Sequence, residues 1–581
     1  MSAIVNNPTI SVASMARVQQ VPAWCLSLLG ACLLWLSQPP LGLSLLAWVA
    51  VVPWIAFAVR TNLTRRDRFV FFLIAMGYWG LTMQGIRHAH PAMYAALIAF
   101  AFYLASYSLV FINLLSWLQR SKSRIPLWIA IPIIGTGLEC IRNYLLTGVS
   151  AVMLGHTQAN HETMIQIADA FGSYGITFLV LAMNAAIYHM IGIEHLPIAP
   201  RITRMRKRFV PLALAGCLLL GNLVYGAWRL SQANLVVETQ RSHLNIALLG
   251  RDEEIVFVQD AKRESEIFQA YFLQSVEAAK LVAESGQRLD AVVWPESMYT
   301  GSLPWMLIDP PTSPDSRIDP EFAAVIKENQ DAFQSRGAFV QAAIRNITGQ
   351  ANDPDLIVGC SVVRYNDPPK VHSGIVHLAE QGKVKSWYGK THLVMFGEYI
   401  PLIDYLPFLN RFIPPGMGVA RGDGPKSMVV GEVGLVPNIC IETAVERVAP
   451  QHVAELTREQ FSADAIVNVT NDGWFDRSSV VEHHLRCSQF VAVATRRPVL
   501  ISANGGPTAW IDGSGRVIER LAYEQSGAII VNLSVDNRWG LYQAIQDWPA
   551  RMLAGYCFVL MLQACIKYYR ERRKSKALSD I

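Results

Sequence analysis

Three reactive side chains stand where apolar, strand-like segments end. Glu296 follows the apolar DAVVWP, Lys390 opens KTHLVMFGEYIP, and Cys440 ends GLVPNIC. Open α/β folds place their sites at the ends of buried strands. The sequence therefore predicts that a carboxylate, an amine and a thiol converge at one edge of a sheet.

This trio suits covalent acyl transfer through a thioester. A thiol is a good nucleophile only as the thiolate, and a neighbouring carboxylate can take its proton. An ammonium group stabilises the thiolate and then the oxyanion of a tetrahedral intermediate. Spacing alone leaves a second interpretation open, because a Cys that ends an apolar strand is more often an inert core residue. Cys360 and Cys487 lie in the same region without a comparable acid or base motif.

The region around the trio alternates short apolar strands with helices. Such alternation predicts a layered α/β domain with buried sheets. No GxGxxG follows a strand, no Walker-type loop occurs, and no CxxC pair or Cys/His cluster appears, so we expect neither cofactor nor metal. Strands are predicted at 243–250, 290–297, 338–344, 355–364, 373–380, 434–440, 464–470 and 498–504, and helices at 264–283 and 479–495.

The composition points to a membrane protein. Of 581 residues, 52% are hydrophobic and only 16% are charged, whereas soluble domains average about 25% charged. The net charge of +5 is too small to suggest a nucleic-acid partner. Since about 20 apolar residues cross a bilayer, eight spans are predicted, at 21–37, 41–59, 69–86, 93–118, 125–138 (continuing past Glu139 and Arg142), 173–193, 209–227 and 548–566.

Basic residues set the expected orientation. They cluster at 60–68, 120–124, 201–208 and 567–576, and the alternate short loops hold almost none. Basic loops stay in the cytoplasm, so both termini are expected there. The predicted domains are 1–228 with seven transmembrane helices, 229–547 as an exported catalytic domain, and 548–581 as a last transmembrane helix with a basic tail.

Longer motifs resemble a known family. They occur in the order WPES (294–297), KTHLVMFGEYIP (390–401), NICIET (438–443), NVTNDGWFD (468–476) and HLRCSQFVAVATRRPVLISANGG (484–506). Together they resemble the carbon–nitrogen hydrolase (nitrilase) superfamily, and with the predicted spans they look like its membrane-embedded branch, the apolipoprotein N-acyltransferases. GLECIRNYLLTG (137–148) and IQIADAFGSYGITFLV (165–180) resemble the membrane segments of that family.

The resemblance implies a fold and a set of roles. The fold is an eight-helix membrane domain plus an exported α-β-β-α sandwich. Glu296 is implied as general base, Lys390 as stabiliser of thiolate and oxyanion, and Cys440 as nucleophile. Glu398 is implied to orient Lys390 or handle protons, with a buried structural carboxylate as the alternative, and Glu442 is similar to another family acid.

The implied reaction moves an acyl chain between lipids. Its donor is a phospholipid, expected to be phosphatidylethanolamine, and its acceptor is the α-amino group of a lipoprotein's diacylglyceryl-cysteine. The protein is expected to be a multi-pass monomer of the bacterial inner membrane, with its catalytic domain in the periplasm. An apolar mouth that excludes water from the thioester is expected at 301–315, with Trp305, Met306 and Leu307, or at 402–420; ordinary loop packing is the alternative.

The chain departs from the family pattern at four places. Ile441 replaces a common Tyr, Met395 replaces Pro, and Val149–Ala151 replace Phe-Pro-Trp. Val491–Ala494 replace the family's Arg-Ala-x-Glu, so both charges of that motif are lost. These changes bear on the acyl chain, headgroup and acceptor more than on the reaction class. Two other functions stay open: a membrane-tethered amidase or nitrilase-type hydrolase that passes the acyl group to water, and a catalytically degenerate lipoprotein-binding scaffold.

Overall fold

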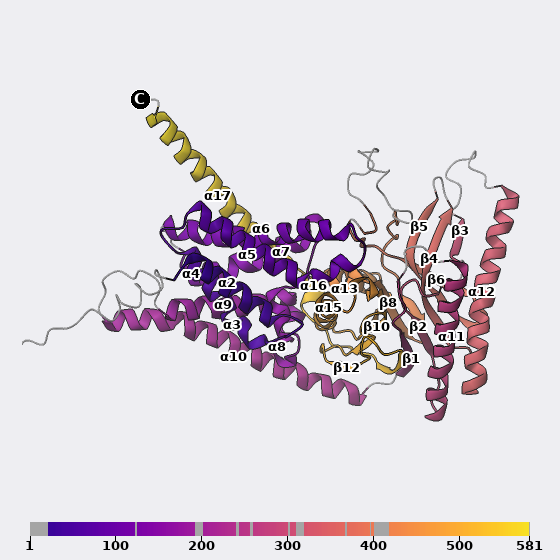
Figure 1. The fold of residues 1–581 in the computed structure, drawn as a ribbon. Coiled ribbons are helices and arrows are strands. Elements are labelled where there is room, and N and C mark those ends of the chain that lie inside the picture. The colour runs from indigo at the N-terminus through magenta and orange to yellow at the C-terminus, as the bar shows by residue number, and fades with distance from the viewer. Residues whose placement is uncertain are drawn as a thin grey trace, which may run out of the picture. The chain divides into compact units, whose positions relative to one another are not determined.

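The chain forms two compact units, each described here by itself. A computed structural model describes residues 21–121, 125–191, 201–239, 243–255, 260–299, 303–308, 319–365, 369–395, 397–399 and 418–579. Unit 1 comprises Met1–Tyr144, Val152–Trp228 and Asp547–Ile581, and unit 2 comprises Leu145–Ala151 and Arg229–Gln546. Figure 1 labels their helices and strands.

Unit 1 is helical. Its described α-helices are α2 (Ala23–Ser37), α3 (Ala47–Ala50), α4 (Val52–Ala58), α5 (Arg65–Thr82), α6 (Met93–Arg120), α7 (Leu127–Tyr144), α8 (Glu162–Ile165), α9 (Ala168–Met190), most of α10 (Arg201–Thr239) and α17 (Trp548–Ser579). Five described segments are long and apolar enough to cross a membrane: Met93–Arg120, Leu127–Thr147, Ala168–Met190, Phe209–Ala233 and Trp548–Glu571. Ala23–Ser37 and Ser44–Ala58 are shorter apolar helical segments.

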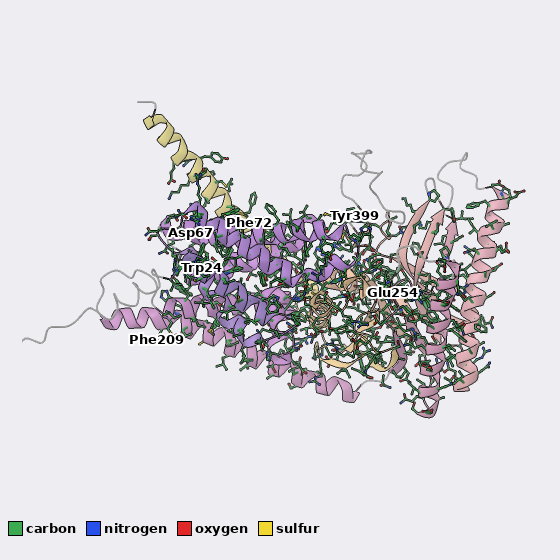
Figure 2. All side chains as sticks on the ribbon, viewed as in Figure 1. Trp24, Asp67, Phe72, Phe209, Glu254 and Tyr399 are labelled. Atoms are coloured by element: carbon green, nitrogen blue, oxygen red, sulfur yellow. The ribbon has the colours of Figure 1, made fainter. Side chains whose placement is uncertain are left out.

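The outward faces of these helices are apolar. Trp24 on α2 and Phe209 on α10 are about half exposed, at 53% and 52% (Figure 2). Water-soluble proteins rarely expose contiguous apolar surface of this extent. Inside the unit, Gly137 of α7 faces α17 so closely that an added Cβ would lie 2.6 Å from Cys557 Sγ. Small residues permit such close helix approach in membrane proteins, and unit 1 is accordingly a membrane domain.

Unit 2 contains two mixed β-sheets. The first has the order β13-β1-β2-β4-β5-β6, with β3 paired to β4, and the second has the order β12-β11-β10-β9-β8-β7. In the first, β1, β2 and β4 are parallel, as are β8, β9 and β10 in the second. The strands are β1 (His243–Gly250), β2 (Ala291–Trp294), β3 (Trp305–Ile308), β4 (Asp355–Tyr365), β5 (Lys370–Leu378), β6 (Val384–Gly389), β7 (Met428–Val430), β8 (Val433–Ile439), β9 (Ala465–Asn471), β10 (Val499–Asn504), β11 (Ala509–Ile511), β12 (Val517–Arg520) and β13 (Gly527–Ser534).

The main helices of unit 2 bury one face each. One apolar cluster joins α11 and α12 to the first sheet, a second joins side chains of both sheets, and a third joins α14 and α15 to the second sheet. The helices are α11 (Ala261–Glu284), α12 (Pro320–Thr348), α13 (Ile441–Ala444), α14 (Val448–Arg458), α15 (Ser479–Thr495) and α16 (Tyr542–Ile545).

Most predicted elements of unit 2 are confirmed, and one is wrong. The strand predicted at 338–344 lies inside helix α12, where Phe333, Gly337, Val340 and Ile344 share the buried face. A short apolar run does not by itself distinguish a strand from a buried helix segment. The spacing of three and four residues over the longer window is what identifies the helix.

Candidate active site

Glu296 lies just beyond the end of β2, and its carboxylate contacts both sheets. Ser373 Oγ of β5 donates to its Oε1 at 3.2 Å, and the Asn471 amide of β9 donates to its Oε2 at 3.1 Å. The neighbouring strand β4 can pass this close to Glu296 because it has a glycine, Gly359, at the point of contact. A Cβ there would overlap the Pro295 carbonyl and lie 2.7 Å from Glu296 Cα. Burial raises the pKa of Glu296, an effect that Lys390 opposes.

Lys390 follows β6 and is almost fully buried, with 1% of its surface exposed. Its Nζ lies 2.6 Å from Glu398 Oε1 and 3.6 Å from Glu296 Oε1. Burial by itself lowers the pKa of Lys390, but Glu296, Cys440 and Glu398 together raise it above its usual value. The amine is therefore a fixed cation held between two carboxylates. Glu398 is itself oriented, because the Val394 amide donates to its Oε2 at 2.8 Å.

Cys440 directly follows β8 and has a backbone conformation that only a few per cent of non-glycine residues adopt, with φ 49° and ψ −115°. Its amide donates to the Val469 carbonyl of β9 at 2.9 Å, which fixes the turn. Burial and the negative charge of Glu296 raise the pKa of the Cys440 thiol, and Lys390 opposes them. The thiol therefore rests protonated, and a base must take its proton when it attacks. Strained backbone of this kind is concentrated at functional sites.

Glu442 is a fully buried carboxylate that holds two loops together. Its Oε1 accepts hydrogen bonds from the Thr391 amide at 2.7 Å, the Thr391 hydroxyl at 2.6 Å and the His392 amide at 3.0 Å. Its Oε2 accepts the Ile439 amide at 2.8 Å, and Tyr388 Oη lies within 2.8 Å of both oxygens. Glu442 therefore ties the segment after Lys390 to the strand end before Cys440. It is a positioning residue in this geometry.

A buried polar chain, which the sequence did not predict, supports the nucleophile turn. The Thr443 hydroxyl lies 2.8 Å from His484 Nε2, and His484 Nδ1 lies 3.2 Å from Asp472 Oδ1. Because a carboxylate only accepts, we assign the proton to Nδ1, so that Nε2 accepts from Thr443. The Thr470 hydroxyl donates to the same Asp472 oxygen at 2.9 Å, and Thr470 is one of the neighbours that lower the pKa of the Cys440 thiol. Asp472 and His484 both lie in the segments that resemble the family, but the sequence did not predict a hydrogen-bond partner for either residue.

Two of the departures from the family pattern have a local explanation. The segment Leu145–Ala151 belongs to unit 2, where the Glu446 amide donates to Ser150 Oγ at 3.1 Å. The altered residues at 149–151 thus lie against the helical turn that follows the nucleophile. Val491 and Ala494 of α15 are 0% and 4% exposed. Apolar side chains avoid the desolvation of two charges at these buried positions.

Two further expectations have different outcomes. Cys360 is buried in the core, and burial raises its pKa to about 12, as expected of an inert thiol. Trp305, Met306 and Leu307 form β3, and Trp305 packs against Phe333 with ring centroids 5.3 Å apart, which is the ordinary packing named as the alternative for that residue; the apolar mouth stays a prediction. The other predicted mouth is the segment 402–420, and its residues up to 417 lie outside the described residues.

Comparisons with known proteins agree with the two-unit organisation. Residues 30–186 match the family described as Apolipoprotein N-acyltransferase N-terminal domain, and residues 261–539 match Carbon-nitrogen hydrolase. An apolipoprotein N-acyltransferase of Rhodopirellula baltica is 38% identical over 94% of this chain and 98% of its own. One from Geobacter metallireducens is 28% identical over 85% of this chain and 86% of its own.

Among solved structures, an amidase from Nesterenkonia sp. is 16% identical and has a TM-score of 0.34, covering 54% of this chain and 96% of its own. The long match to the Rhodopirellula protein and the two family matches decide the assignment. This chain belongs to the apolipoprotein N-acyltransferase family, with a membrane domain joined to a carbon–nitrogen hydrolase domain.

Proposed function

We propose that this protein transfers a fatty acyl chain from a phospholipid to the α-amino group of the diacylglyceryl-cysteine of apolipoproteins. One observation carries the catalytic part. Lys390 is held between Glu296 and Glu398, and its charge lowers the pKa of the half-buried Cys440 thiol, which supports one cluster of acid, amine and thiol. A carboxylate, a cation and a thiol so placed suit thioester chemistry.

In the first half-reaction Glu296 takes the thiol proton, and Cys440 Sγ attacks the ester carbonyl of the phospholipid. Lys390 and the backbone N–H groups after Cys440 stabilise the oxyanion. The carbon–oxygen bond then breaks, Glu296 returns the proton to the glycerol oxygen, and a lysophospholipid leaves. The acyl chain remains on sulfur as a thioester.

In the second half-reaction the α-amino group of the acceptor attacks the thioester carbonyl. Glu296 takes the amine proton, the carbon–sulfur bond breaks, and the sulfur recovers the proton. An amide is released and the enzyme is restored, which is ping-pong chemistry. Glu398 and Glu442 act through the groups that they hold, Glu398 through Lys390 and Glu442 through both loops.

The proposal includes a topology. The exported region 229–547 lies between the seventh and the eighth of the eight proposed membrane helices and is proposed to be a periplasmic α-β-β-α sandwich. Residues 1–228 and 548–581 provide seven helices and one helix, with both termini in the cytoplasm of a bacterial inner-membrane monomer. Support comes from the basic clusters on one side and from the three apolar clusters of unit 2. Phosphatidylethanolamine is the proposed donor.

The other two candidate functions have less support. A simple hydrolase needs no extensive membrane domain, whereas two family matches cover both the membrane and the hydrolase parts of this chain. A degenerate scaffold needs no buried Lys390 with two carboxylate partners. Buried charges are costly to retain without a use.

Acyl label on the protein tests the proposal. The full chain is incubated with phospholipid labelled in its acyl chains and then quenched. We expect label that hydroxylamine releases, that is absent from Cys440→Ala, and that moves to an added diacylglyceryl-cysteine peptide. Cys360→Ala is the matched control and should be labelled as wild type. Label that passes to water but not to the peptide would favour the hydrolase, and no Cys440-dependent label would favour the scaffold.

A further inference from the structure

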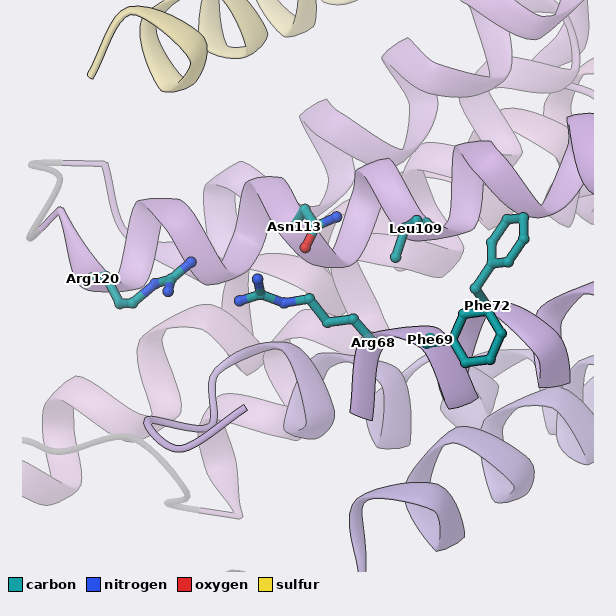
Figure 3. A pocket seen from close by; sticks show the side chains of 6 residues that line it. All are labelled: Arg68, Phe69, Phe72, Leu109, Asn113 and Arg120. Atoms are coloured by element: carbon teal, nitrogen blue, oxygen red, sulfur yellow. The ribbon is translucent and has the colours of Figure 1, made fainter. Parts of the chain in front are cut away.

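A cavity of about 380 Å³ lies between α5 and α6 of the membrane unit (Figure 3). One end is basic and the other is apolar. The six described residues that line it are Arg68, Phe69 and Phe72 of α5 and Leu109, Asn113 and Arg120 of α6. They include no carboxylate.

Among the described residues, neither guanidinium group has an acidic partner; Arg120 Nε donates to the Ser116 carbonyl of its own helix at 3.2 Å. Figure 3 shows the ends of Arg68 and Arg120 directed toward one another, and Arg120 acts on Arg68 by electrostatic repulsion. Arg68 Nε is buried and has no hydrogen-bond partner among the described residues. The neighbouring Asp67 is engaged elsewhere, since its carboxylate accepts from the Thr64 amide at 2.9 Å and hydroxyl at 2.7 Å.

The N-terminus of α5 adds to this imbalance. Arg68 lies in the first turn of α5 and lines the cavity, whereas Arg66 of the same turn is exposed and does not line it. The N-terminus of a helix carries partial positive charge and favours an anion there. Arg120 is the last residue of α6, where the helix carbonyls offset part of its charge, so the excess positive charge that a bound anion would offset lies mainly at Arg68.

The rest of the cavity is apolar. Phe69 is 61% exposed, and Phe72 and Leu109 continue the lining away from the arginines. Asn113 adds an amide donor between the two ends. Along the cavity, the cationic groups are followed by the amide and then by the apolar surface. This order matches a glycerophospholipid, which presents a phosphate, ester carbonyls and acyl chains in that order.

We propose that this cavity binds an anionic glycerophospholipid as a structural ligand, with its phosphate between Arg68 and Arg120 and an acyl chain along Phe72 and Leu109. The proposal rests on the topology proposed above, which places these helix ends in the cytoplasmic leaflet. A headgroup with its own ammonium would meet two arginines, so phosphatidylglycerol should bind better than phosphatidylcholine. Membrane-surface arginines typically add about 1 kcal/mol each.

Native mass spectrometry of the full chain in nonionic detergent tests this. The delipidated protein is titrated separately with phosphatidylglycerol, phosphatidylcholine and inorganic phosphate. We expect a phosphatidylglycerol adduct that is weakened about 10- to 30-fold in Arg68→Gln/Arg120→Gln, and little binding of the other two. Arg66→Gln, an exposed arginine of the same turn, is the matched control and should bind as wild type.

Three results would overturn the proposal: equal binding by the double variant, equal binding of phosphatidylcholine, or binding of inorganic phosphate alone with the same arginine dependence. If the double variant does not fold, Arg120→Gln alone, at the exposed end of α6, serves with a smaller expected loss. Cys440-dependent acyl labelling is measured on the same preparation. Failure of the lipid site and failure of the proposed reaction are thereby separated.

Discussion

The hydroxyl of Thr470 donates a 2.9 Å hydrogen bond to the carboxylate of Asp472. Asp472 raises the pKa of the Cys440 thiol and Thr470 lowers it, so both residues belong to the electrostatic surroundings of the nucleophile. His484 links that aspartate to Thr443 in the turn after Cys440. One buried carboxylate therefore acts electrostatically on the nucleophile and, through His484, holds the turn that follows it.

Replacing Asp472 by Asn should lower the pKa of the Cys440 thiol. The carboxylate is one of the negative groups that raise this pKa, so its removal favours the thiolate at a lower pH. The measurement is the pH dependence of iodoacetamide alkylation at Cys440. Asp476→Asn, four residues along the chain, is the control. An unchanged midpoint of the alkylation pH profile in Asp472→Asn would show that Asp472 does not influence the nucleophile.

Glu296→Gln should slow formation of the acyl-enzyme by about 100-fold or more, because a positioned general base typically contributes that much. Only the ionised carboxylate accepts the thiol proton, and burial raises the pKa of Glu296. Wild-type activity should therefore fall as the pH drops through this raised pKa, at a higher pH than for an exposed Glu. In single-turnover assays, Glu296→Gln should no longer show this fall in activity at low pH. Glu284→Gln, at the exposed end of α11, should still show it.

Lys390→Met should destabilise the protein by about 3–5 kcal/mol, because it leaves buried carboxylates without their cation. The partners are Glu398 at 2.6 Å and Glu296 at 3.6 Å. Adding Glu398→Gln to Lys390→Met should restore part of the loss, since one unpaired charge is removed. Thermal unfolding in detergent measures stability. Additive losses in the double variant would contradict the coupling.

Glu442→Gln should cost about 1–3 kcal/mol of stability, because an amide nitrogen would face backbone donors. Oε1 accepts from Thr391 and His392, and Oε2 accepts from Ile439, so neither oxygen can be replaced without opposing an N–H group. Acyl-enzyme formation should fall with it. Tyr388→Phe removes a donor to the same carboxylate and should be milder in both assays. The reverse order would show that the backbone contacts are unimportant.

Gly359→Ala should lower activity by displacing Glu296. Its Cβ would overlap the Pro295 carbonyl and approach Glu296 Cα to 2.7 Å, both of which are backbone atoms that cannot move aside locally. Gly527→Ala on β13 is the control, because its Cβ would make ordinary contacts with Leu521. Acyl-enzyme formation by a stably folded Gly359→Ala at the wild-type rate would show that the strand tolerates the shift.

The sequence by itself determined the reactive residues and most of the elements that carry them. Lys390 follows β6, a strand that the prediction lacked, whereas Glu296 and Cys440 stand at the ends of predicted apolar segments, which are β2 and β8. Local pattern suffices here, because an apolar run bounded by turn residues reports a buried strand directly. It failed at 338–344, where a short apolar run belongs to the longer helix α12.

Only the tertiary structure decided the partners of these residues. Glu442 between two loops and the Thr443–His484–Asp472 chain join side chains that the sequence separates by up to 51 residues. The positive φ of Cys440 and the narrow space at Gly359 are likewise set by neighbouring strands. Hydrogen bonds and close packing act over a few ångströms, so they depend on which strand ends become neighbours. A one-dimensional pattern identifies the groups, whereas the fold fixes their distances and charges.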